Sequence, residues 1–216
     1  MRRLLPLLLC SVLVLAGCST AYYGAMEKLG VPKRQILVDR VESARGAQQE
    51  AKQQFASALE QFLAVTKVPS TELKAAYDRL NDELRRSEAR AKEVRDRLAA
   101  IDDVARALFE EWNVELAQYS NPGLRAQSAR QLDATRRRYT DLMRVMHAAA
   151  GRMDPVLATF RDQVLFLKHN LNAQAVAALG NTSRDLQQDI TQLIADMEKS
   201  IREADAFVSA MQAAAK

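Results

Sequence analysis

LKAAYDRLNDELRRSEARAKEVRDRLAAIDDVARALFEEW, residues 73–112, is the stretch of sequence that decides the fold. Apolar or small residues recur in it at alternating steps of four and three, and most positions between them are charged or alanine. Such a seven-residue repeat is typical of a helix that packs along one continuous seam in a coiled coil or long bundle. Neither glycine nor proline interrupts the stretch, and its abundant Ala, Leu, Glu and Arg favour helix. It therefore predicts one long helix.

The same repeat occurs in the stretches on either side, and turn-forming residues separate them. The turns are expected at Pro69-Ser70-Thr71, Asn121-Pro122-Gly123 and Gly180-Asn181-Thr182-Ser183. The helices are expected at residues 33–67, 71–119, 123–179 and 183–213. No segment alternates with a period of two, as a strand would. The sequence therefore predicts an all-α fold of four long antiparallel helices in a coiled-coil-like bundle.

The seams also predict how neighbouring helices align. Facing residues of the second and third helices have numbers that sum to 244, which places Leu84 opposite Phe160. The corresponding sums are 138 or 139 for the first and second helices, and 360 or 361 for the third and fourth. The first and fourth helices would then stop at similar heights. We expect one helical domain over residues 33–216, from which residues 102–145 protrude as a two-helix stalk.

Two local patterns refine this expectation. Acidic side chains dominate residues 102–115 and basic ones dominate residues 125–144, which suits antiparallel pairing of the stalk helices. Pro155, inside the third helix, cannot donate a backbone hydrogen bond and predicts a kink or a loosened turn. The alternative is a fresh helix start capped by Asp154.

Residues 1–17 have the features of an export signal. Arg2 and Arg3 precede a short apolar run over residues 4–15, which Leu15-Ala16-Gly17-Cys18 ends. A cysteine in this position resembles the lipobox of bacterial lipoproteins, in which Cys18 is diacylated and anchors the mature chain to the membrane. The alternative is an ordinary cleaved signal that leaves Cys18 as a free thiol. Residues 18–32 would form the lipid-anchored linker, and Ser19 resembles the sorting signal for the outer membrane.

Composition and motifs give no indication of catalysis. The formal net charge of +4 falls to +2 once Arg2 and Arg3 are removed, which gives no support for nucleic-acid binding. Di-iron bundles need Glu-x-x-His pairs, but Arg144 precedes His147 and Phe166 precedes His169 at that spacing. Hydrolase and phosphate-binding motifs do not occur. We therefore expect no catalytic residue, no metal site and no cofactor, and a protein that is not an enzyme.

A few residues are candidates for binding. Lys168, His169, Asn170 and Asn172 form a polar cluster that is either a binding patch or a set of helix-capping groups. Trp112 and Asn121 lie near the tip of the expected stalk, which either reaches a partner in the membrane or stands in solvent. Tyr22-Tyr23 is expected either at the level of the lipid headgroups or within a disordered tether.

Three segments carry a resemblance to a known family. They are Tyr22-Tyr23-Gly24-Ala25-Met26-Glu27-Lys28, Ile36-Leu37-Val38-Asp39-Arg40-Val41 and Gln163-Val164-Leu165-Phe166-Leu167-Lys168-His169-Asn170-Leu171-Asn172. The chain resembles a family of Gram-negative bacterial lipoproteins called domain of unknown function 2959. The resemblance implies a helical, coiled-coil-rich envelope protein and supplies no catalytic residues.

These observations together predict a non-enzymatic scaffold that is anchored by Cys18 to the outer membrane, faces the periplasm and binds an unidentified envelope protein. The alternative is a periplasmic helical bundle that binds a ligand or a lipid. Small seam residues such as Ala44 and Ala91 speak against a roomy cavity, because they let helices pack closely.

Overall fold

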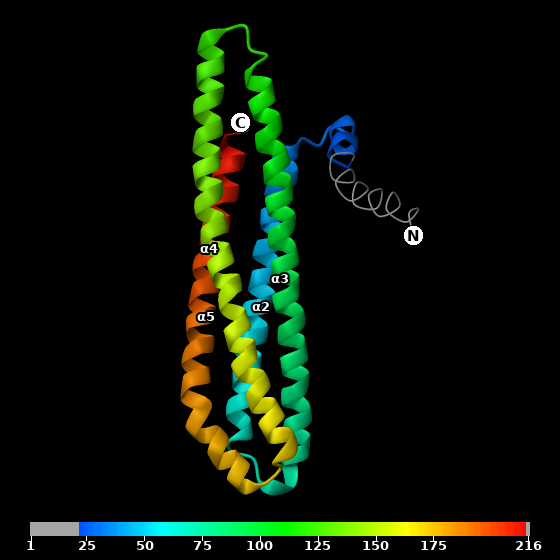
Figure 1. Cartoon of the computed structure of the whole chain (residues 1–216), viewed down its shortest axis with the longest axis vertical. Helices are drawn as coiled ribbons and strands as arrows, with labels where there is room; N and C mark the ends of the chain where they lie inside the picture. The colour runs from blue at the N-terminus through cyan, green and yellow to red at the C-terminus, as the bar shows by residue number, and fades with distance from the viewer. Residues whose placement is uncertain (1–21, 215–216) are drawn as a thin grey trace, which may run out of the picture. The chain divides into compact units, whose positions relative to one another are not determined.

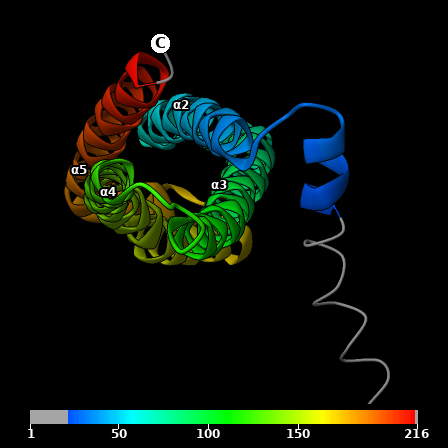
Figure 2. The ribbon, with the colours of Figure 1, turned by 90° about the horizontal axis from the view of Figure 1, so that it is seen from above.

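The structure, a computed structural model, describes residues 22–214 and consists of long helices (Figure 1). In chain order these are α2 (Lys33–Val65), the short 3-10 helix η1 (Ser70–Glu72), α3 (Leu73–Leu116), α4 (Pro122–His169) and α5 (Ala173–Ala213). Residues 22–28 form a further helical segment before α2 (Figure 2). The expected all-α fold of long packed helices is confirmed.

The chain divides into two compact units, and the divisions fall inside α2, α3 and α4. Unit 1 contains the described residues up to 40 and residues 99–137. Unit 2 contains residues 41–98 and the described residues from 138 onward.

The core of unit 2 is built from the predicted seams. The seam residues of α2 in this unit are all buried: Val41, Ala44, Gln48, Ala51, Phe55, Ala58, Phe62 and Val65. The rings of Phe62 and Phe160 meet edge to face, with centroids 6.3 Å apart, which is a geometry that aromatic pairs favour. Ala91 and Ala149 are fully buried as well, as expected for helices in close contact.

Cross-helix ion pairs in unit 2 agree with the predicted register of α2 on α3 and with the predicted direction of α3 against α4. Arg90 of α3 pairs with Glu50 of α2 at 2.6 Å, which agrees with the register predicted for these two helices. Arg95 of α3 pairs with Asp154 of α4 at 2.8 Å, so these two helices run antiparallel, as expected. α4 is a single helix that continues through Pro155, so the alternative of a fresh start at Asp154 is wrong.

The prediction for the last connection is wrong. α4 ends at His169 and α5 begins at Ala173, whereas the sequence analysis placed the turn at residues 180–183. The Asn170 side-chain amide donates to the carbonyl of Phe166 at 2.9 Å, and the Asn172 amide donates to the carbonyl of Asn170 at 2.8 Å. These local bonds compete with helical ones. Gly180 lies inside α5, where a glycine costs only about 1 kcal/mol relative to alanine.

The earlier turn changes the register of α5 on α4. Arg152 pairs with Asp196 at 2.5 Å, whereas the predicted register would place it opposite residue 208 or 209. Phe207 of α5 instead shares a small pocket with Arg138 and Leu142 of α4. Part of the segment that was assigned to the stalk is therefore packed against α5.

Unit 1 contains the connection between α3 and α4. Asn121 caps α4, because its side-chain oxygen accepts hydrogen bonds from the amides of Gly123 at 2.9 Å and Leu124 at 3.1 Å. Pro122 occupies the first helical position, where its missing N–H costs nothing. The turn predicted at Asn121-Pro122-Gly123 is thus confirmed. Every residue from 117 to 127 is exposed.

Candidate functional site

The segment between the proposed anchor and α2 has a defined structure in unit 1. The amide of Val31 donates to the carbonyl of Met26, and that of Gly30 to the carbonyl of Glu27, both at 2.9 Å. Gly30 has a φ of 81°. This pair of bonds around a left-handed glycine is the Schellman motif that ends helices. Residues 22–28 therefore form a short helix that ends at Gly30, so this part of the expected linker has regular secondary structure.

Tyr23 docks this segment on α3. Its ring is buried, and its hydroxyl donates a hydrogen bond to Asp103 Oδ2 at 2.7 Å. Burial raises the pKa of the Tyr23 phenol to about 12, and the hydrogen bond to Asp103 adds to the shift. Tyr23 is thus buried against α3 rather than part of a disordered tether, and its height relative to the lipid headgroups stays a prediction.

Lys33 makes a second attachment at the first residue of α2. Its ammonium group contacts Glu27 of the docked segment and Glu111 Oε2 of α3, the latter at 2.5 Å. Only 12% of the Lys33 side chain is exposed. Burial would lower the pKa of Lys33, but the bonds to Glu111 and Glu27 outweigh it and raise that pKa. One cation therefore joins two carboxylates from separate segments.

The two carboxylates respond differently to this arrangement. The hydrogen bond from Lys33 lowers the pKa of Glu27. Burial raises the pKa of Glu111, against the opposing influence of Lys33. Both contacts of Lys33 are charge-assisted, and such hydrogen bonds are stronger than neutral ones.

An open groove of about 570 Å³ lies along this junction. It is lined by Tyr23, Gly24, Glu27, Lys33, Asp103, Arg106, Ala107, Glu110, Glu111 and Val114. Its carboxylates outnumber its cations, but Asp103 and Glu111 already have partners. The hydroxyl of Tyr23 and the carboxylate of Asp103 are bonded to each other, and together with Lys33 they hold residues 22–31 on α3.

Sequence reasoning missed most of this site. Asp103 and Glu111 were assigned to an acidic strip that faces arginines of the hairpin, but their bonds go to Tyr23 and Lys33. Arg136 instead lies over the ring of Phe109, 5.3 Å from its centroid. The adjacent residues Tyr22 and Tyr23 were the one usable signal of a packing contact. Neighbouring positions on a helix point in different directions, so one ring of such a pair can pack against protein while the other is exposed.

The predicted polar cluster lies at the α4–α5 connection. Lys168 and His169 are exposed in the last turn of α4, where basic side chains favour the helix dipole. Asn170 and Asn172 form the turn itself. The geometry agrees with the capping alternative, and a role for these residues in binding stays a prediction.

The remaining predicted positions are accounted for as follows. The indole N–H of Trp112 donates to Ser128 Oγ at 2.9 Å and joins α3 to α4. Asn121 is the exposed cap of α4. Cys18 lies outside the described residues. Trp112 thus joins two helices, and Asn121 caps one. Contact of either residue with a partner stays a prediction.

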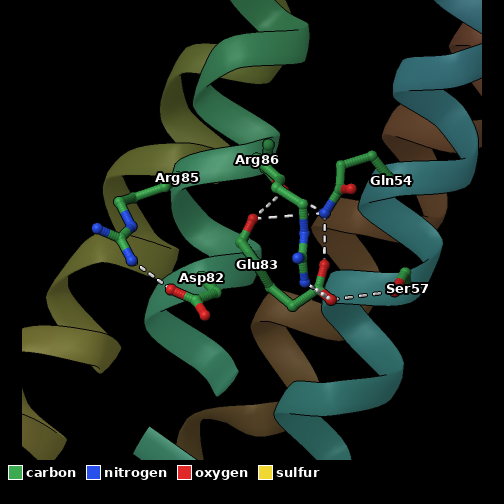
Figure 3. A network of polar contacts seen from close by, with 7 residues as sticks. Gln54, Ser57, Asp82, Glu83, Arg85 and Arg86 are labelled. Atoms are coloured by element: carbon green, nitrogen blue, oxygen red, sulfur yellow. Dashed lines mark hydrogen bonds and ion pairs between the residues drawn. The ribbon is translucent and has the colours of Figure 1, made fainter. Parts of the chain in front are cut away.

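Unit 2 contains a separate polar network between α2 and α3 (Figure 3). The side chain of Glu83, which is 6% exposed, accepts hydrogen bonds from Gln54 at 2.5 Å and from Ser57 at 3.4 Å. Arg86 pairs with the same carboxylate at 2.6 Å. Deeper in the unit, Ser200 Oγ donates to Gln48 Oε1 at 2.7 Å, and both residues are fully buried. These bonds specify how the helices pair.

The described residues contain neither a membrane-spanning helix nor a cluster of metal ligands. Among residues 22–214, none of the helices is long and apolar enough to cross a membrane. In the same part of the chain, His, Cys, Asp and Glu side chains do not gather in threes as a metal ion would require.

Comparison with known proteins gives one family match. Residues 22–211 match the model of a family described as protein of unknown function DUF2959. No curated protein and no solved structure matches the chain.

Proposed function

We propose that this chain, which belongs to the family of proteins of unknown function DUF2959, is a non-enzymatic, lipid-anchored interaction protein of the bacterial envelope. The observation that carries the proposal is Leu15-Ala16-Gly17-Cys18 behind a basic start and a short apolar run. In this proposal Cys18 carries two acyl chains, which suffice for stable membrane attachment. Ser19 supports the outer membrane as the destination, with the helices in the periplasm.

The interior favours an interaction protein over a carrier of ligands. Alanines at seam positions, such as Ala51 and Ala91, are fully buried. Small residues at such positions bring helix backbones together rather than apart. A bundle that carries a lipid needs an apolar cavity. The groove beside Tyr23 and Lys33 in unit 1 is instead open, and most of the residues that line it are charged. Lipid that copurifies with the protein, beyond its own anchor, would instead favour the ligand-binding alternative.

The turn between α3 and α4 is the surface that we propose for the partner. Val114, Tyr119 and Leu124 are 65%, 42% and 53% exposed there. Arg125 and Arg130 lie close by, and residues 116–132 contain no acidic residue. Glu115 is exposed beside Val114, so the arginines border the apolar tip on the α4 side only. An apolar tip with such a border suits a membrane-embedded protein. A two-helix stalk shorter than the expected 102–145, without the residues from 138 onward that pack against α5, is part of this proposal, with the tip at its end.

The lipid anchor is tested by changing Cys18 to serine. We expect the variant to leave the membrane fraction, or to keep its signal peptide, because no acyl chain can be attached. Mass spectrometry of the wild-type N-terminus should show a diacylated cysteine. A serine variant that is processed and stays on the membrane like the wild type would refute the anchor.

The partner surface is tested by photo-crosslinking in cells. A photoreactive residue in place of Ser120, which is exposed beside the cap of α4, should capture an envelope protein. The same residue in place of Asp189, which is exposed on α5, serves as the control. Equal adducts at both positions, or none at Ser120, would contradict the proposed surface.

A further inference from the structure

The docked segment has a second face that nothing in unit 1 covers. Tyr22 is 43% exposed and Leu29 is 76% exposed. Ala25 is exposed between them. Tyr22 and Ala25 lie three residues apart on the short helix, and Leu29 follows four residues later in the turn that ends it, so the three form one stripe. Tyr23 and Glu27, which make the contacts to Asp103 and Lys33, lie on another side of the helix, and the Tyr23 ring meets the Tyr22 ring edge to face.

The chain that precedes this stripe is short. Cys18 is four residues before Tyr22, so an extended connection spans at most about 15 Å. If residues 19–32 were fully extended, α2 could begin as far as about 45 Å from Cys18. Because Tyr23, Lys33 and the Schellman motif fix residues 22–31 in unit 1, a lipid on Cys18 keeps the stripe close to the bilayer.

We propose that Tyr22, Ala25 and Leu29 form a stripe that rests on the lipid interface of the membrane that holds Cys18. Tyrosine is favoured at that depth, because its ring is apolar and its hydroxyl reaches water. Leucine on the apolar side of an interfacial helix enters the boundary between headgroups and acyl chains.

The stripe orients the protein rather than anchoring it. A helix of this length is marginal in isolation and offers little apolar area, so the acyl chains supply the attachment. The contacts of Tyr23 and Lys33 carry the orientation from the stripe to α3. Unit 1 would then be held against the membrane through a rigid connection instead of a loose tether.

The inference rests on the proposed anchor, and one experiment separates the two. The lipidated protein is reconstituted into vesicles of phosphatidylethanolamine and phosphatidylglycerol with brominated acyl chains. An environment-sensitive fluorophore is attached to a cysteine introduced by Leu29→Cys, which is possible because acylation blocks the thiol of Cys18. The matched control is Lys28→Cys, since it has the same tether length but points to another side of the helix. Flotation of the vesicles reports attachment.

We expect the Leu29 probe to show blue-shifted emission and strong quenching by brominated lipid, and the Lys28 probe to show less of both. Protein that floats with the vesicles while the Leu29 probe keeps its aqueous emission would overturn the stripe and leave the anchor standing. Equal quenching of the two probes would also overturn it, because no face would be selected. Protein that does not float would refute the anchor and the stripe together.

Discussion

Changing Tyr23 to phenylalanine should release the docked segment without disturbing the long helices. The substitution keeps the buried ring and removes the hydroxyl that donates to Asp103. A hydrogen bond to a charged group contributes about 1.5–3 kcal/mol. We therefore expect local opening of residues 22–31 to increase about ten- to hundred-fold. Hydrogen exchange at the amides of Gly30 and Val31, whose bonds close the Schellman motif, measures that opening.

Alkaline pH should weaken the same attachment in the wild type. The pKa of Tyr23 is raised from its usual value of 10.0 to about 12 by burial and by Asp103, so the docked state holds this proton more strongly than the released state. Stability is then unaffected below pH 10 and falls as the pH rises from 10 to 12, by up to about 3 kcal/mol. The raised pKa of Lys33 acts in the same direction, because its ion pairs are lost when the lysine deprotonates.

Ultraviolet absorbance of tyrosinate detects this titration directly. The wild type should show one tyrosine that ionises near pH 12, and Tyr23→Phe should lack that step. Tyr22→Phe is the control, because it removes a half-exposed neighbour and leaves the bond to Asp103 in place. Loss of the step in the control, or unchanged amide exchange in Tyr23→Phe, would refute the reasoning.

Three further predictions concern stability. Gly30→Ala should raise amide exchange in the docked segment, because a φ of 81° strains an alanine by about 1 kcal/mol. Gly46→Ala, inside α2 with no atom near its new Cβ, should raise the free energy of unfolding in urea by about 0.5–1 kcal/mol, and effects of the same sign for the two changes would contradict this. Ser200→Ala should cost about 1–3 kcal/mol in urea denaturation, since Gln48 is left buried without its donor, and adding Gln48→Leu should restore most of the loss. Phe160→Ala should cost about 3–5 kcal/mol in the same assay, and a loss below 1 kcal/mol would show that its ring does not pack on the core.

The sequence by itself determined which residues form the core of the long helices. Ala44 of α2, Ala91 of α3 and Phe160 of α4 were assigned to the seams from their spacing alone, and all three are buried. The buried face of a helix can be predicted from the sequence, because residues three and four apart share one face whatever packs against it. The turn at Asn121 was equally readable, since capping and proline at the first helical position act over a few residues.

Only the tertiary structure decided the last register and the docked segment. Asn170 and Gly180 both signal a turn, and the choice between them depended on how far α5 packs along α4. The bond between Tyr23 and Asp103 joins residues 80 positions apart. No periodicity relates such residues, because their approach depends on the path of the chain between them. The candidate site could therefore not be read from the sequence, although each of its charged groups was visible there.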